Sequence, residues 1–134
     1  MNEIKGYEDI PIGMEMGPLE LTMDDTFFDE RMVSIQWLNN APLKSQELMP
    51  PGITIVNHAK MKFMALPNMK ASIWAKSEHE FIKPIKYGSK VTIRGKVIEK
   101  FEKRGRNYVI SEYETVDENG DLLLRSWETG LYVE

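Results

Sequence analysis

Apolar and polar residues alternate with a period of two from residue 70 to the C-terminus, and this pattern constrains the fold more than any other feature. Four long stretches show it, at residues 71–82, 90–102, 107–116 and 122–133. In the second stretch Val91, Ile93 and Val97 alternate with polar residues, which is typical of an antiparallel strand with one buried face. These stretches are longer than the usual strand of about five or six residues. They predict an antiparallel sheet long enough to curl around a helix.

Turn residues separate these strands. Asn119 and Gly120 lie between the third and fourth strands, and this dipeptide is typical of a tight hairpin turn in which both central residues have positive φ. Gly105, within "RGRN", marks the preceding hairpin. The strands are therefore expected to follow one another as a meander.

Helical periodicity precedes the strands. Thr22 and Asp25 have the spacing of a capping box, which predicts a helix over residues 23–38. A second helix is predicted over residues 52–66, substantially buried by an apolar face. The residues assigned to that face are Ile53, Val56, Ala59, Phe63 and Met64, and those assigned largely off it are Asn57, His58 and Lys62. With a short strand in "PLELT" after an irregular segment at about 1–17, the order predicts an α+β domain.

The composition limits the possible classes of protein. The 134 residues suit a single domain over 1–134, and 42% of them are hydrophobic. The 17 Lys and Arg against 21 Asp and Glu give a net charge of −4, so no binding to nucleic acid or to a membrane surface is expected. There is no cysteine and there are only two histidines, so neither a disulfide scaffold nor a metal site is expected. The sequence shows no export signal or membrane span, which predicts a cytoplasmic protein.

Prolines interrupt the chain between the two predicted helices. Pro42, Pro50 and Pro51 prevent a helix from continuing through residues 39–51, because proline lacks an N–H and restricts the residue before it. An irregular connection of about 12 residues inside a small domain is usually functional. We therefore expect this loop, which begins "NNAPLK", to carry part of a site.

The C-terminal half resembles the MaoC-like family of hot-dog hydratases and dehydratases, in particular the N-terminal type of MaoC domain. The features that carry the resemblance are Phe81, Pro84 and Gly88 before a long strand, then "EKRGR", a strand, "ENGD" and a last strand with Arg125. Ser89 departs from the family, which often has Asp after that glycine. The resemblance implies a single hot-dog fold, in which a long antiparallel sheet wraps around a central helix.

The resemblance also implies a function. It implies an acyl thioester ligand, usually an acyl-CoA, bound in a tunnel between two hot-dog units, and reversible addition of water to an enoyl thioester. The chain would then be a component of an enoyl-CoA hydratase or acyl dehydratase, a lyase of fatty acid metabolism. It would form a homodimer, or a heterodimer with a second hot-dog chain, and would need no cofactor other than the acyl-CoA itself.

Active members of the family carry the pattern Asp-x-Asn-Pro-x-His in the loop after the first helix. Aligned through Pro42, this chain has Asn39 at the Asp position and Lys44 at the His position. An amide has no useful proton affinity near neutral pH, and lysine has an ordinary pKa of about 10.4, so the two do not replace a carboxylate and an imidazole. Asn39 and Lys44 are thus catalytic candidates by position only, and as ordinary residues they would be a helix cap and a solvated lysine.

Three further residues are candidates. Active members have a glycine at the start of the central helix, where Gly52 and Ile53 stand, and backbone N–H groups at a helix start favour a thioester oxygen. A helix start after two prolines is the alternative interpretation. His58 is predicted on the central helix, either as a replacement acid or base or as a buried histidine with a structural partner. His79, between two glutamates, is predicted at the surface.

Three functions follow. The first is a MaoC-like acyl-CoA hydratase or dehydratase component that binds an acyl thioester and depends on a catalytic hot-dog partner. The second is a stand-alone enzyme, an acyl-CoA thioesterase or a hydratase, that uses relocated residues such as His58. The third is a non-catalytic, acyl-CoA-binding hot-dog module.

Overall fold

The computed structural model describes residues 6–24, 26, 47–50, 52–66 and 70–133. Its elements, in chain order, are η1 (Tyr7–Asp9), β1 (Glu15–Thr22), α3 (Val56–Ala65), β2 (Ala71–Phe81), β3 (Lys90–Lys103), β4 (Arg106–Val116) and β5 (Leu122–Val133). The predicted helix over 23–38 lies almost entirely outside the described residues. The predicted irregular segment at 1–17 is wrong at its end, because β1 already begins at Glu15.

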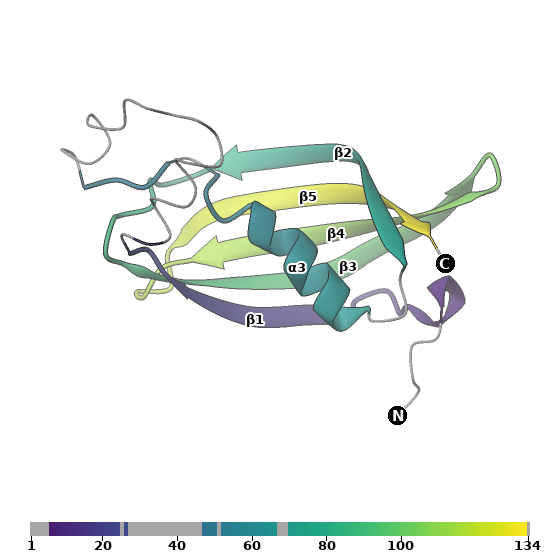
Figure 1. Cartoon of the computed structure of the whole chain (residues 1–134), viewed down its shortest axis with the longest axis horizontal. Coiled ribbons are helices and arrows are strands. Elements are labelled where there is room, and N and C mark those ends of the chain that lie inside the picture. Colours follow the sequence, from purple (N-terminus) through teal and green to yellow (C-terminus); the bar gives the residue numbers. More distant parts are fainter. Residues whose placement is uncertain (1–5, 25, 27–46, 51, 67–69, 134) are drawn as a thin grey trace.

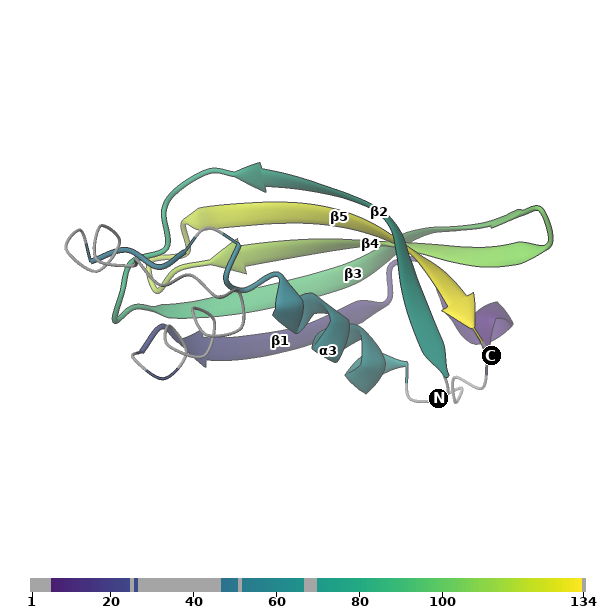
Figure 2. The ribbon, with the colours of Figure 1, turned by 45° about the horizontal axis from the view of Figure 1, so that its top comes forward.

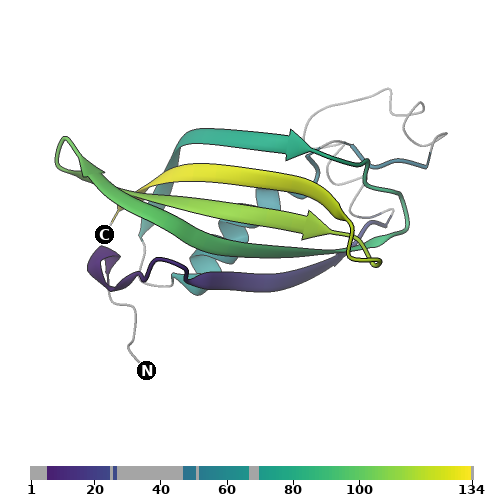
Figure 3. The same ribbon diagram turned by 180° about the vertical axis from the view of Figure 1, so that it is seen from behind.

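The five strands form one sheet in the order β1-β3-β4-β5-β2, and all neighbouring strands are antiparallel. The sheet curls, and α3 lies across its concave face (Figures 1 and 2). Seen from behind, the convex face of the sheet is not covered by any helix of the described residues (Figure 3). The predicted α+β architecture, a long sheet wrapped around a helix, is confirmed.

The observed bounds of β2 to β5 agree with the bounds predicted from the alternation to within about one residue, and both hairpins occur where they were predicted. At the β3–β4 hairpin Arg104 and Gly105 have φ values of 53° and 73°, as a two-residue turn of the primed type requires. The turn expected at Asn119–Gly120 differs, because only Gly120 has positive φ. The Asp117 carboxylate instead accepts the N–H groups of Asn119 and Asp121, both at 2.9 Å, which closes a longer turn.

The central helix differs from its prediction in two ways. It begins at Val56 rather than at residue 52, and it turns the opposite face to the sheet. His58, Met61 and Lys62 are buried, whereas Val56 is 53% exposed and Met64 is 68% exposed. His58 and Lys62 form hydrogen bonds with polar side chains of the sheet. The helix therefore buries these two side chains and leaves much of its apolar face uncovered.

Two apolar clusters fill the space between helix and sheet. One surrounds Met61 and includes Tyr113 and Tyr132, and the other surrounds Ile53 and includes Met49 and Leu123. Along β5 the buried residues between Leu124 and Tyr132 are Ser126, Glu128 and Gly130. A polar stretch therefore separates the two clusters beneath the helix. No helix of the described residues has the length and apolarity needed to cross a membrane.

Candidate functional site

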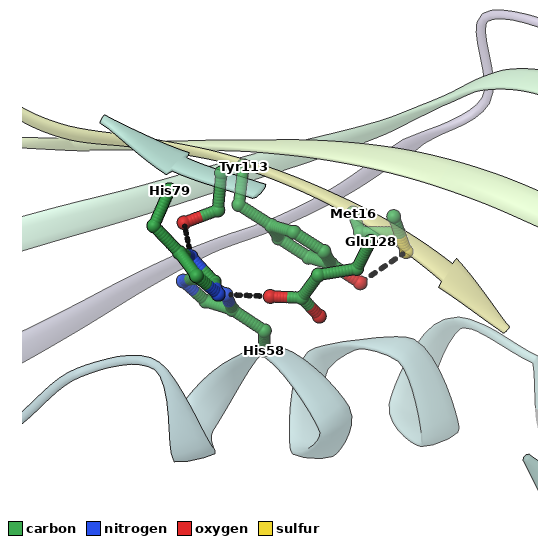
Figure 4. Close-up of polar contacts among 6 residues, drawn as sticks. Met16, His58, His79, Tyr113 and Glu128 are labelled. Atoms are coloured by element: carbon green, nitrogen blue, oxygen red, sulfur yellow. Dashed lines mark hydrogen bonds and ion pairs between the residues drawn. The ribbon is translucent and has the colours of Figure 1, made fainter. Parts of the chain in front are cut away.

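A carboxylate–imidazole pair lies at the centre of this polar stretch. Nδ1 of His58 on α3 is 2.5 Å from Oε2 of Glu128 on β5, and both side chains are buried (Figure 4). The His58 ring stacks on Tyr113 of β4, with the ring centres 4.3 Å apart and the planes 5° from parallel. The imidazole is thus held by the carboxylate at one edge and by the aromatic ring across one face.

The pairing determines which nitrogen of His58 is available for chemistry. An ionised carboxylate only accepts hydrogen bonds, so Nδ1 carries the proton that it donates to Glu128. Nε2 is buried and has no hydrogen-bond partner among the described residues. Figure 4 shows the contact between the His58 ring and the Glu128 carboxylate. An imidazole held by a carboxylate in this way can act as a general base where a substrate reaches its other nitrogen.

Tyr113 is packed so closely that its neighbour has to be glycine. A Cβ atom on Gly95 of β3 would lie 2.7 Å from the Tyr113 ring. The Tyr113 hydroxyl points toward the sulfur of Met16 at 3.9 Å, a weak contact. Burial raises the pKa of Tyr113, and the nearby Glu128 carboxylate raises it further. The phenol is therefore neutral at physiological pH and acts as a flat support for His58.

A buried lysine approaches the same carboxylate. Nζ of Lys62, one turn after His58 on α3, donates to Oγ of Ser72 on β2 at 2.9 Å. A side chain on Gly130 would collide with this ammonium group, so the glycine leaves the space that it occupies. Burial lowers the pKa of Lys62, and the negative charge of Glu128 opposes that shift. Glu128 therefore faces a histidine and a lysine at once.

His79 contributes a second polar pair. Its Nδ1 lies 2.7 Å from Oγ of Ser126, directly across from it on β5. Directly paired residues point to the same side of a sheet. Ser126 faces the helix with Glu128, so His79 does too, and Figure 4 shows it on the helix-facing side. The prediction that His79 lies at the surface is wrong, because the residue is half-buried.

An apolar cavity of about 310 Å³ lies beyond this second pair, at the N-terminal end of α3. Its lining consists of Leu48, Met49, Gly52, Phe81, Ile82, Lys83, Pro84, Ile85, Leu123 and Leu124. Phe81 and Leu124 are the next helix-facing residues after His79 and Ser126 on their strands. The polar stretch thus continues directly into the wall of this cavity.

Of the two predicted substrate-binding residues, Gly52 is in the wall of this cavity and Ile53 follows it in the chain. Neither is at the start of the helix, where both were expected. Gly52 lines the cavity with a φ of 75°, and the helix begins only at Val56. The N–H of Ile53 donates to the Pro50 carbonyl at 3.2 Å, and the Ile53 side chain is in the core. Their assignment as substrate-binding residues stays a prediction. Asn39 and Lys44, the other catalytic candidates, lie outside the described residues.

Comparison with known proteins shows the fold. No family model matches the chain, and neither does any curated protein. Solved structures do match. The R-hydratase PhaJ1 from Pseudomonas aeruginosa matches with a TM-score of 0.79 at 13% identity, over 97% of this chain and 86% of that one. The chain has the hot-dog fold.

Two further structures extend the comparison. A MaoC-like dehydratase from Rhodospirillum rubrum matches with a TM-score of 0.73 at 12% identity, over 96% of this chain and 97% of that chain. The HadBC (3R-hydroxyacyl-ACP dehydratase) complex from Mycobacterium tuberculosis matches with a TM-score of 0.74 at 13% identity, over 90% and 96%. These solved structures share the hot-dog architecture that the sequence predicts.

The sequence pattern indicates His58 as a candidate residue but none of its partners. Glu128 carried a signal, because it is in phase with Leu124 and Tyr132 on a strand whose alternate residues were expected to be buried. A carboxylate at such a position requires a partner, and His58 was the only histidine predicted near the core. Tyr113 and Ser126 also occupy alternating positions whose side chains are buried on their strands. The polar residues at these buried positions are therefore the sequence signal for this site.

Proposed function

We propose that this hot-dog chain is a MaoC-like hydratase or dehydratase component that binds an acyl thioester, such as an enoyl-CoA, and acts with a second, catalytic hot-dog chain. The observation that supports this most directly is the apolar cavity bounded by Gly52, Phe81 and Leu124. Ligand sites are typically concave and mainly apolar with a few polar groups. An acyl chain suits such a lining, in which the charged residue Lys83 forms an ion pair with Asp121 at 3.3 Å.

In this proposal a second chain supplies the acid and the base of the reaction. Hydration of an enoyl thioester takes one group to remove a proton from water and another to deliver a proton to carbon. Asn39 and Lys44 stand where active family members have Asp and His, and an amide cannot act as the base. A partner that carries the intact pattern would supply both groups to a tunnel formed in part by this chain.

The described surface favours such an assembly. β2 is an edge of the sheet in this structure, and the large apolar side chains Ile73 and Trp74 on it are exposed. On α3 the apolar residues Val56, Phe63 and Met64 are exposed as well. An unpaired edge strand beside an uncovered apolar helix face is a common place for a subunit contact. The HadBC complex among the similar structures is described as a complex of such a dehydratase.

The test measures binding and turnover separately. Crotonyl-CoA is titrated into the purified chain by calorimetry, and its hydration is assayed with the chain alone and with a hot-dog chain encoded nearby. We expect binding by the chain alone and hydration only with the partner. Phe81→Arg should weaken binding, whereas Ile12→Arg should not, because Phe81 lines the cavity and Ile12 does not, although the two are 57% and 58% exposed. Absence of both binding and turnover in every combination would overturn the proposal.

A second candidate is a stand-alone enzyme, either a thioesterase or a hydratase. The contact between Glu128 and His58 favours it, because an imidazole oriented by a carboxylate can take a proton from water. His58→Gln keeps an N–H donor for Glu128, so the chain should stay folded and bind acyl-CoA, whereas turnover by the isolated chain should be abolished. Unchanged turnover in His58→Gln removes this candidate. Binding without turnover in any pairing would instead indicate a non-catalytic acyl-CoA-binding module.

A further inference from the structure

The pair formed by His79 and Ser126 is not used by the function proposed above, and it lies between the apolar cavity and the His58–Glu128 pair. On one side along the strands are Phe81 and Leu124, which line the apolar cavity. On the other side is Glu128, which holds His58. The rings of His79 and Phe81 are in contact range, with their centres 6.4 Å apart and tilted by 41°. The polar pair thus lies directly behind the cavity wall.

The hydrogen bond to Ser126 determines what His79 can offer a ligand. The Ser126 hydroxyl is fully buried, and a buried hydroxyl is stabilised when it donates its proton to an acceptor. Among the described residues its partner is Nδ1 of His79. With Nδ1 accepting, Nε2 carries the ring proton in the neutral imidazole and remains a donor. His79 therefore presents an N–H donor on the helix-facing side of β2, where it is only half-buried.

The cavity is also small. Its volume of about 310 Å³ is at the lower end of the range of about 300–1,000 Å³ that is typical of ligand pockets. A pocket of this size suits a short acyl chain better than a long aliphatic tail. An acyl chain that lies against Phe81 and extends along the strands toward Glu128 meets His79 next, because His79 is the neighbouring helix-facing residue on β2.

From these observations we infer a substrate class. We propose that the cavity selects short acyl thioesters whose acyl chain ends in an oxygen acceptor, such as a carboxylate, and that His79, positioned by Ser126, donates a hydrogen bond to that oxygen. This inference rests on the proposed function, since it assumes that the cavity takes an acyl thioester. It assigns His79 and Ser126 to specificity, separately from the acid and base of the reaction.

The experiment compares three coenzyme A thioesters by calorimetric titration into the full chain. Succinyl-CoA and butyryl-CoA have acyl chains of equal carbon number that differ in the terminal carboxylate, and octanoyl-CoA tests length. We expect succinyl-CoA to bind roughly tenfold more tightly than butyryl-CoA, because a hydrogen bond from His79 to a carboxylate is charge-assisted and stronger than one between neutral groups. Octanoyl-CoA should bind more weakly than butyryl-CoA.

Variants locate the effect. His79→Phe keeps an aromatic ring and removes the donor, so the preference for succinyl-CoA should disappear while butyryl-CoA binding stays the same. Ser126→Ala frees the ring to rotate and should reduce the preference in part. Glu80→Gln is the control, since Glu80 is the exposed neighbour of His79 on β2 and points away from the helix. Melting curves check that each variant is folded.

The outcomes separate the two proposals. If butyryl-CoA and succinyl-CoA bind equally to the parent chain, or if His79→Phe keeps the preference, the inference about His79 is wrong and the proposed acyl-thioester function stands. If none of the three thioesters binds, the proposed function is wrong and the inference that rests on it is wrong as well. A preference that Glu80→Gln abolishes would also overturn the assignment to His79.

Discussion

His58 on α3 and Glu128 on β5 are joined through Nδ1 and Oε2 at 2.5 Å, in the middle of the polar stretch between the two apolar clusters. This contact explains the orientation of the helix. If α3 were rotated to bury Val56 and Met64, Glu128 would remain beneath it without a partner, and an unpaired buried charge is costly. The pair therefore selects one rotation of the helix, even though that rotation exposes apolar side chains.

The first prediction concerns this pair. Replacing Glu128 by Met, or His58 by Phe, should lower the free energy of unfolding by about 3–5 kcal/mol, because removing one member of a buried pair leaves the other unpaired. The double variant should be destabilised by much less than the sum of the two losses, since both polar groups are then gone. Urea denaturation of all four proteins gives the coupling energy. Additive losses would show that the two side chains do not depend on each other.

The second prediction is a pH dependence that arises from Lys62. Burial lowers the pKa of this ammonium group in the folded chain, so the unfolded chain retains the proton to a higher pH. Where the unfolded state binds more protons, stability rises with pH, here up to the ordinary lysine pKa of about 10.4. Lys62→Met removes this dependence. The stability of Lys62→Met relative to the parent should therefore fall as the pH is raised from neutral toward that value.

Denaturation at several pH values measures this difference in the free energy of unfolding. The titration of Tyr113 does not contribute to the difference, because both proteins contain Tyr113. Lys60→Met is the matched control, since Lys60 is exposed on the same helix. Its stability difference from the parent should not change with pH. A Lys62→Met difference that is equally flat would mean that Lys62 keeps its ordinary pKa in the folded chain.

These contacts explain which parts of the structure the sequence could predict. The four long strands followed from alternation alone, because one face of each meets the core and the other meets solvent. The rotation of α3 did not follow, because hydrophobic periodicity assumes that apolar side chains are the buried ones. His58 and Lys62 were assigned to the wrong face since their partners, Glu128 and Ser72, are distant in sequence.

The site shows the same limit. The neighbours Glu78 and Glu80 favour a surface position for His79, but residues adjacent on a strand point to opposite faces. Counting along β2 from Phe81 would have placed His79 on the helix-facing side. Gly52 was expected at the helix start because prolines precede it, and the chain instead makes turns until Val56. The roles of Asn39 and Lys44 remain predictions, because both residues lie outside the described residues.

The third prediction tests the support of His58 by Tyr113. Gly95→Ala should destabilise the chain by about 1–3 kcal/mol, because the new Cβ would lie 2.7 Å from the Tyr113 ring and the core has to shift. In a Tyr113→Leu background the same substitution should cost much less, since the smaller side chain leaves space. Thermal melts of the parent, both single variants and the double variant measure the difference. An equal cost in both backgrounds would locate the strain elsewhere.

The fourth prediction concerns the exposed edge of the sheet. Trp74 on β2 is 48% exposed, and in the proposed assembly a second hot-dog chain covers it. Trp74→Arg should therefore shift the chain from dimer to monomer, measured by light scattering after size-exclusion chromatography over a range of concentrations. Ile12→Arg changes another exposed apolar residue that lies outside β2 and α3, and it should leave the dimer intact. If the parent chain is monomeric alone, the same comparison is made with the candidate partner, and retention of the complex by Trp74→Arg would show that β2 is not the contact.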